Sequence, residues 1–257
     1  MSSYFPDHFS GVAGAYAEHR PLYPTRLFEW LAALAPRRGL AWDCGTGSGQ
    51  AALGLAPHFE RVVATDASAA QIGEARLHPR VQYRVAPAES SGLSAAAVDL
   101  VTVGQALHWF DRPAFYSEAR RVLRPGGVVA AWTYGGSRFD DPRIDEIHRR
   151  FYTGTIGPYW PPERALVEAG YRTIEFPFDE IVPPAFEMEA DWPLAAFLGY
   201  VGTWSAVTQF REACGFDPVE RLGEELRPHW GESDALRRIR WPLTLRVGRS
   251  GKREVTR

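Results

Sequence analysis

The stretch Ala41-Trp42-Asp43-Cys44-Gly45-Thr46-Gly47-Ser48-Gly49 carries a short apolar run into a glycine-rich loop. Residues 40–43 predict a strand, and the small apolar residues 50–56 predict a helix that packs closely on a sheet. A glycine loop between a strand and a helix lies at the carboxyl edge of a parallel sheet, where open α/β folds bind ligands. Alternatively, these glycines form only a structural turn.

Strands and helices alternate along the chain around this loop. Apolar runs predict further strands at 61–66, 81–85, 98–103 and 128–134, and periodic or capped segments predict helices at 24–34, after Ser68 and after Asp111. This alternation is typical of an α/β, Rossmann-like fold with a mostly parallel central sheet and helices on both faces.

The chain after Gly135 is less regular. It predicts helices near 142–152, 161–169, 191–201 and 207–214, and late strands at 171–181 and 239–247. No linker-like stretch divides the chain, so we predict one domain over residues 1–257 rather than a separate second domain. Its expected parts are an N-terminal helix or lid (1–35), a cofactor-binding core (36–134), and the end of the sheet with inserted cap helices over the carboxyl rim (135–257).

Two residues beside the glycines indicate which ligand the loop binds. A dinucleotide-binding loop has glycine at the sixth position counted from Gly45, and Gln50 stands there instead. Asp43 would repel a pyrophosphate and attract a cation. S-adenosylmethionine suits such a loop, because it carries a sulfonium and an ammonium group and no phosphate. Asp66, at the end of the next strand, can hold a ribose diol, or else it only caps a helix.

The region from Trp42 to Trp132 resembles the class I S-adenosylmethionine-dependent methyltransferases. Within that class it is similar to the small-molecule group that includes the trans-aconitate methyltransferase-like proteins. The matching segments are 42–50, 63–66, 88–89, 99–110 and 121–127, with 16–24 upstream. The second half of the chain matches this pattern poorly.

The resemblance implies a set of cofactor contacts. The backbone of the glycine loop would face the methionine part, Asp43 its ammonium directly or through water, and Asp66 the ribose. The full expected set is Tyr16, Arg20, Asp43, Gly45, Thr46, Gly47, Gly49, Asp66, Ala67, Ala88, Glu89 and Gln105. Many relatives carry Asp where Pro87 stands here, so the adenine contact would fall to backbone groups or to Glu89.

The segment 105–110 follows the fourth strand and would lie beside the transferred methyl group. His108 is the candidate general base, because its ordinary pKa lies near neutrality; alternatively it is a structural histidine. Trp109 is either a pocket wall or part of the core. Arg20 would pair with a carboxylate from a folded-back lid, unless it lies on the surface of an N-terminal helix.

The aromatic-rich second half is expected to help bind the acceptor. The substrate-binding candidates are Trp109, Tyr134, Trp160 and Trp204. No Asn/Asp-Pro-Pro-Tyr segment of the kind that accompanies methylation of base or Gln nitrogens occurs. This favours an oxygen acceptor, carboxylate or hydroxyl, with carbon as the alternative. The alternatives are a methyltransferase that acts on RNA or protein and a non-catalytic module that only binds the cofactor.

Composition limits the partners. The net charge is −2, so no basic excess favours a nucleic acid, and we expect a small-molecule partner. Two cysteines offer neither a disulfide framework nor a zinc site, and no metal is expected. Without a signal-like N-terminus or a long apolar run, the chain is expected to be cytoplasmic and not bound to a membrane, as a monomer or homodimer.

Overall fold

The structure, a computed structural model, describes residues 21–251, so the expected lid residues Tyr16 and Arg20 lie outside it. The described chain forms two compact units that are interleaved in sequence. The sheet unit comprises Tyr23–Tyr134, Ala165–Phe186 and residues 243–251; the helical unit comprises residues 21–22, Gly135–Arg164 and Glu187–Pro242. That both act as one domain with a capped rim stays a prediction.

The sheet unit contains the predicted parallel sheet. Its strands are β1 (Leu40–Cys44), β2 (Arg61–Asp66), β3 (Val81–Val85), β4 (Val98–Gly104) and β5 (Leu123–Thr133), in the order β3-β2-β1-β4-β5. All four neighbouring pairs are parallel, and the end of β9 (Arg237–Arg249) adds an antiparallel strand beside β5. The strand order reverses between β1 and β4, where open α/β sheets bind ligands at the carboxyl edge. The predicted α/β class is confirmed.

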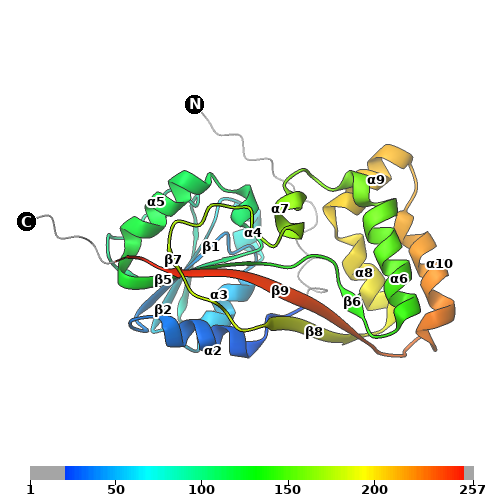
Figure 1. Cartoon of the computed structure of the whole chain (residues 1–257), viewed down its shortest axis with the longest axis horizontal. Helices are drawn as coiled ribbons and strands as arrows, with labels where there is room; N and C mark the ends of the chain where they lie inside the picture. The colour runs from blue at the N-terminus through cyan, green and yellow to red at the C-terminus, as the bar shows by residue number, and fades with distance from the viewer. Residues whose placement is uncertain (1–20, 252–257) are drawn as a thin grey trace, which may run out of the picture. The chain divides into compact units, whose positions relative to one another are not determined.

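Helices cover both faces of this sheet: α2 (Thr25–Leu34) and α3 (Gln50–Leu55) lie on one face, and α5 (Arg112–Val122) lies on the other (Figure 1). The β2–β3 connection holds α4 (Ala69–Gly73), and η1 (Leu107–Trp109) is a short 3₁₀ helix after β4. The predicted caps are present, because Ser68 accepts a hydrogen bond from the Gln71 amide and Asp111 accepts one from the Ala114 amide.

The helical unit contains the helices that the sequence predicted only in part. Its elements are β6 (Arg138–Phe139), α6 (Pro142–Arg150), the π-helical η2 (Phe151–Thr155), η3 (Gly157–Tyr159), most of β8 (Phe186–Trp192), α8 (Leu194–Gly202), α9 (Ser205–Cys214), α10 (Pro218–Trp230) and the start of β9. Helix α10 was not expected, since Pro218, Gly223 and Pro228 obscure its period; Pro218 in fact occupies its first turn, where proline is tolerated.

The strand expected at 171–181 is wrong except at its end. After α7 (Arg164–Glu168), Gly170 and Tyr171 both have positive φ, which turns the chain. The part of this segment that forms a strand is β7 (Asp179–Glu180), which pairs with β9. Phe176 and Phe178 are buried and alternate as in a strand. They pack into the core beside α5 from an irregular segment, so their spacing imitated a strand.

Candidate functional site

The glycine loop lies immediately after β1. At Gly45, φ is 66° and an added Cβ would lie 2.6 Å from the Cβ of Ala106. At Gly49, φ is 90° and a Cβ would lie 2.3 Å from the Tyr83 hydroxyl oxygen. These contacts leave room only for glycine, so the bare backbone faces its surroundings at the tip of β1.

Asp43 lies beneath this loop and is only 1% exposed. Its carboxylate accepts hydrogen bonds from the Thr46 hydroxyl (2.5 Å) and the Thr102 hydroxyl (2.7 Å), which tie the loop to β1 and β4. Burial raises the pKa of Asp43 to about 6. In this geometry the carboxylate holds the loop from below, and its direct contact with a ligand ammonium stays a prediction.

Asp66 joins the loop to the next turn. One carboxylate oxygen accepts from the Gly47 amide and the other from the Ser68 amide, both at 2.9 Å. Ser68, not Asp66, is the N-cap of α4, so the alternative reading of Asp66 as a helix cap is wrong. The side chain is half-buried at the carboxyl end of β2.

The charge around the loop suits a cationic ligand. The pKa of the Cys44 thiol, at the tip of β1, is raised by burial and then by the negative charges of Asp43, Glu89 and Asp66. Three carboxylates therefore lie near enough to this edge of the sheet to act on one buried group. A sulfonium and an ammonium would be stabilised here, and a pyrophosphate would be repelled, so these residues fit S-adenosylmethionine.

The residues expected around adenine lie close in sequence to these acids. Ala67 is exposed after β2, and Ala88 is buried. Glu89 is half-buried and accepts a hydrogen bond from the Asp111 amide (3.2 Å), which links the segment after β3 to the start of α5.

Gln105 has a role that the sequence did not reveal. Its φ is 57°, unusual for a residue with a side chain, and its own amide donates to the Trp132 carbonyl. Its side-chain amide donates to the Tyr134 carbonyl (3.0 Å) and accepts from the Tyr134 amide and the Thr133 hydroxyl. The side chain thus pairs with the end of β5 as a strand residue would. The resemblance implied that Gln105 contacts the cofactor. In the structure its side chain forms hydrogen bonds with the backbone of Tyr134, which is itself an expected acceptor contact.

His108 is partly exposed on η1, and its Nδ1 lies 2.8 Å from the hydroxyl of Tyr171. Its ring also packs against Trp109, with ring centroids 4.7 Å apart. Tyr171 comes from the turn after α7, and its side chain is fully buried. The sequence missed Tyr171, because 63 residues separate it from His108 and no motif surrounds it.

The other two aromatic candidates lie in the helical unit. Trp160 and Trp204 have ring centroids 5.8 Å apart, and both pack against Tyr152. The guanidinium of Arg164 lies 4.4 Å from the centre of the Trp160 ring and donates to the Tyr152 hydroxyl. The indole N–H of Trp160 is buried without a hydrogen-bond partner among the described residues.

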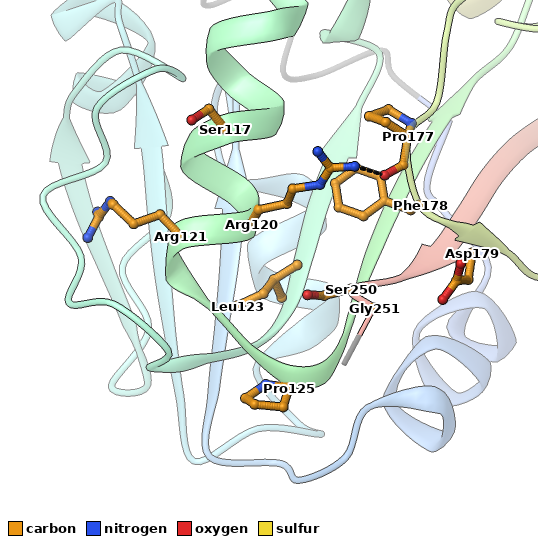
Figure 2. A pocket seen from close by; sticks show the side chains of 10 residues that line it. All are labelled: Ser117, Arg120, Arg121, Leu123, Pro125, Pro177, Phe178, Asp179, Ser250 and Gly251. Carbon is orange, nitrogen blue, oxygen red and sulfur yellow. Dashed lines mark hydrogen bonds between the residues drawn. The ribbon is translucent and has the colours of Figure 1, made fainter. Parts of the chain in front are cut away.

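A pocket of about 540 Å³ in the sheet unit is separate from all of these residues (Figure 2). It lies where α5 ends and β5 begins, at the edge of the sheet opposite the glycine loop. In Figure 2, Arg120 reaches across it to the Pro177 carbonyl, and its guanidinium stacks on Phe178. None of the expected site residues lines it, so this pocket is not the predicted ligand site.

The described residues were also compared with the requirements of a metal site and of a membrane span. Within residues 21–251, no group of three or more His, Cys, Asp or Glu side chains is arranged to hold a metal ion. No helix of that same range has the length and apolar character needed to cross a bilayer.

Comparison with known proteins gives consistent results. Residues 42–131 match a family described as a methyltransferase domain. A Dictyostelium discoideum protein proposed to be a methyltransferase is 33% identical over 233 residues, or 90% of this chain and 89% of its own length. A solved Anaeromyxobacter dehalogenans structure, proposed to be a type II methyltransferase, is 53% identical with a TM-score of 0.86, covering 91% of this chain and 99% of its own. A Saccharomyces cerevisiae protein proposed to be an S-adenosylmethionine-dependent methyltransferase is 29% identical over 54% of this chain and 50% of its own length.

Proposed function

We propose that this chain, which belongs to the class I S-adenosylmethionine-dependent methyltransferases, methylates an oxygen atom, carboxylate or hydroxyl, of a small molecule. The observation that carries the proposal is the glycine loop at the reversal point of the sheet, with the carboxylates of Asp43, Asp66 and Glu89 around it. Its acids suit the cationic cofactor, and its backbone is bare where the methionine part would lie.

In this proposal each side chain of the loop has a binding task. Asp66 holds the ribose diol while it keeps the Gly47 amide in place. Asp43 fixes the loop through Thr46 and Thr102, so that the loop is already formed when the cofactor arrives. Ala67, Ala88 and Glu89 edge the adenine.

The cofactor supplies a methyl group already activated by its sulfonium. The chain must hold the acceptor oxygen in line with that methyl group, about 3 Å away, and exclude water. A carboxylate acceptor needs no base. For a hydroxyl acceptor, His108 takes up the proton as the oxygen attacks. Trp109 and Tyr134, in the sheet unit beside His108, are the proposed walls of the acceptor site.

Charge supports a small acceptor over RNA or protein. A polyanionic partner needs unpaired basic side chains in a stripe. The candidates for such a stripe are the arginine pairs 37–38, 120–121 and 149–150. Three of these side chains are engaged in ion pairs, Arg121 with Glu118, Arg149 with Glu146 and Arg150 with Glu225, whereas the pair at 37–38 is exposed. These ion pairs lower the positive charge available to a phosphate backbone.

The cofactor claim can be tested by isothermal titration with S-adenosylhomocysteine, the product of the transfer. We expect binding in the micromolar range and at least tenfold weaker binding for Asp66→Ala, because the variant loses a carboxylate that both orders the loop and accepts from the ribose. The absence of binding to the unaltered chain would refute the proposal. Turnover in a panel of small carboxylic acids, alcohols and phenols, compared with RNA and protein, then tests the acceptor class.

A further inference from the structure

Within residues 21–251, three residues other than glycine have a positive φ. Two of them hold in place the segment that carries His108. They are Gln105 (φ 57°) and Tyr171 (φ 58°); the third, Ala96, precedes β4. A left-handed backbone costs a residue with a side chain about 1–2 kcal/mol, so it persists only where the surroundings impose it. Gln105 begins the segment, and Tyr171 contacts its histidine.

The backbone of Tyr171 is pinned on both sides. Its amide donates to the Leu166 carbonyl (2.9 Å), which closes the end of α7. Its carbonyl accepts from the guanidinium of Arg246 (2.8 Å) in β9, and Arg246 is in turn held by both carboxylate oxygens of Glu180. The backbone of Tyr171, with its unfavourable φ, is therefore held in place by the ion pair between Arg246 and Glu180.

The ring of Tyr171 is fixed as well. It lies fully buried in the core cluster, and its hydroxyl reaches Nδ1 of His108 at 2.8 Å. The two rings are 5.9 Å apart between centroids. A histidine acts as a base through one ring nitrogen only when the other carries the proton, and the hydrogen bond at that other nitrogen decides which tautomer is present.

We propose that Tyr171 is the positioning residue of the reaction, and that its hydroxyl accepts the Nδ1 proton of His108 and so keeps Nε2 unprotonated. This inference rests on the proposed role of His108 as the base. In the transfer, the methyl–sulfur bond of the cofactor would break as the oxygen–methyl bond forms, leaving S-adenosylhomocysteine, and the proton of the acceptor hydroxyl would pass to Nε2. The resulting imidazolium still donates its Nδ1–H to the Tyr171 hydroxyl oxygen.

The alternative is that Tyr171 merely fills the core and uses His108 to satisfy a buried hydroxyl. Tyr116 offers a matched control, because it belongs to the same core cluster and its buried hydroxyl has no hydrogen-bond partner among the described residues. Tyr171→Phe and Tyr116→Phe each remove one buried hydroxyl and keep the ring, so a difference between them reports the contact with His108.

The first test is the tautomer of His108, which needs no acceptor. In full-length protein labelled with ¹⁵N-histidine, long-range proton–nitrogen correlation spectra distinguish protonated from bare ring nitrogens. Loss of one set of signals in His108→Asn assigns this residue among the seven histidines. We expect protonated Nδ1 and bare Nε2 in the unaltered chain and in Tyr116→Phe, and a shift towards protonated Nε2 in Tyr171→Phe. Protonated Nε2 in the unaltered chain overturns the proposal.

The second test is kinetic and separates positioning from packing. With a hydroxyl acceptor, Tyr171→Phe should lower kcat about tenfold and leave KM for the cofactor unchanged, while Tyr116→Phe changes neither. An unchanged kcat in Tyr171→Phe overturns the positioning role. Titration of S-adenosylhomocysteine with the same proteins keeps the two hypotheses apart: loss of binding by the unaltered chain is a failure of the proposed function, whereas binding with the wrong tautomer is a failure of this inference alone.

Discussion

The sheet unit and the helical unit use their buried residues differently. In the sheet unit, polar side chains sit among the apolar ones at the ends of strands, and Asp43, Thr65 and Thr102 are buried with hydrogen-bond partners. In the helical unit, the core is mainly aromatic: Phe197 stacks on Trp230, and Trp204 meets several other rings. The first pattern holds backbone and carboxylates in place at the proposed cofactor loop, and the second stabilises the fold by packing. Substitutions at the loop of the sheet unit should therefore weaken cofactor binding, and substitutions in the aromatic core of the helical unit should lower the stability of the fold.

The largest effect is expected at Gly45. In Gly45→Ala, the new Cβ would lie 2.6 Å from the Ala106 Cβ at a positive φ. The strain and the overlap together cost about 4 kcal/mol, so affinity for S-adenosylhomocysteine should fall close to a thousandfold by isothermal titration. Gly73→Ala is the control, because its Cβ would meet nothing within 4 Å and should leave the affinity unchanged. Unaltered affinity in Gly45→Ala would show that the loop is not the binding element.

A packing substitution in the helical unit should lower stability without weakening cofactor binding. Trp204→Leu removes a ring that contacts His148, Tyr152 and Tyr200, and we expect the free energy of unfolding to fall by about 3 kcal/mol in urea titrations. S-adenosylhomocysteine should bind the folded variant as before. Leu236→Ala, at an exposed apolar position of the same unit, should change stability by less than about 0.5 kcal/mol. Loss of cofactor affinity in Trp204→Leu would contradict the separation of roles.

Asp43 predicts how stability depends on pH. Its pKa is about 6 in the folded chain against an ordinary value of 3.8, so the folded state binds the proton more tightly. The contribution is fully present below about pH 4 and is lost as the pH rises through about 6. Between pH 4 and 7, the free energy of unfolding should fall by about 2–3 kcal/mol more in the unaltered chain than in Asp43→Asn. Glu60→Gln, which changes an exposed carboxylate, is the control; equal slopes in all three proteins would refute the prediction.

Sequence predicted the parts of the fold that local patterns encode. The strands at 61–66 and 81–85 have the predicted bounds. The apolar run at 62–64 reflects burial in the parallel sheet, whereas 81–85 alternates apolar and polar residues, as suits a strand at the edge of the sheet. Helix α10 and the irregular segment around Phe176 were not predicted correctly, because prolines, glycines and alternating aromatics carry ambiguous local signals.

The same division holds for the site. Gly47 and Asp66 were expected near each other because they follow neighbouring parallel strands, and a hydrogen bond joins them. Two other contacts depend on tertiary structure alone. Gln105 clasps Tyr134 across the end of β5, and Tyr171 reaches His108 from a turn that the sequence predicted as a strand. Neither contact has a pattern of spacing that could reveal it.

Strand β9 has a consequence for how the protein is made. Its first part pairs with β6 in the helical unit, and its last part pairs with β5 in the sheet unit. During translation, residues 237–249 are synthesised after all the other described strands and helices. Neither unit can complete its sheet before then, so both wait for the same late segment. Pairing between residues so distant in sequence is slow to form, and the nascent chain must keep its apolar strands soluble until β9 arrives.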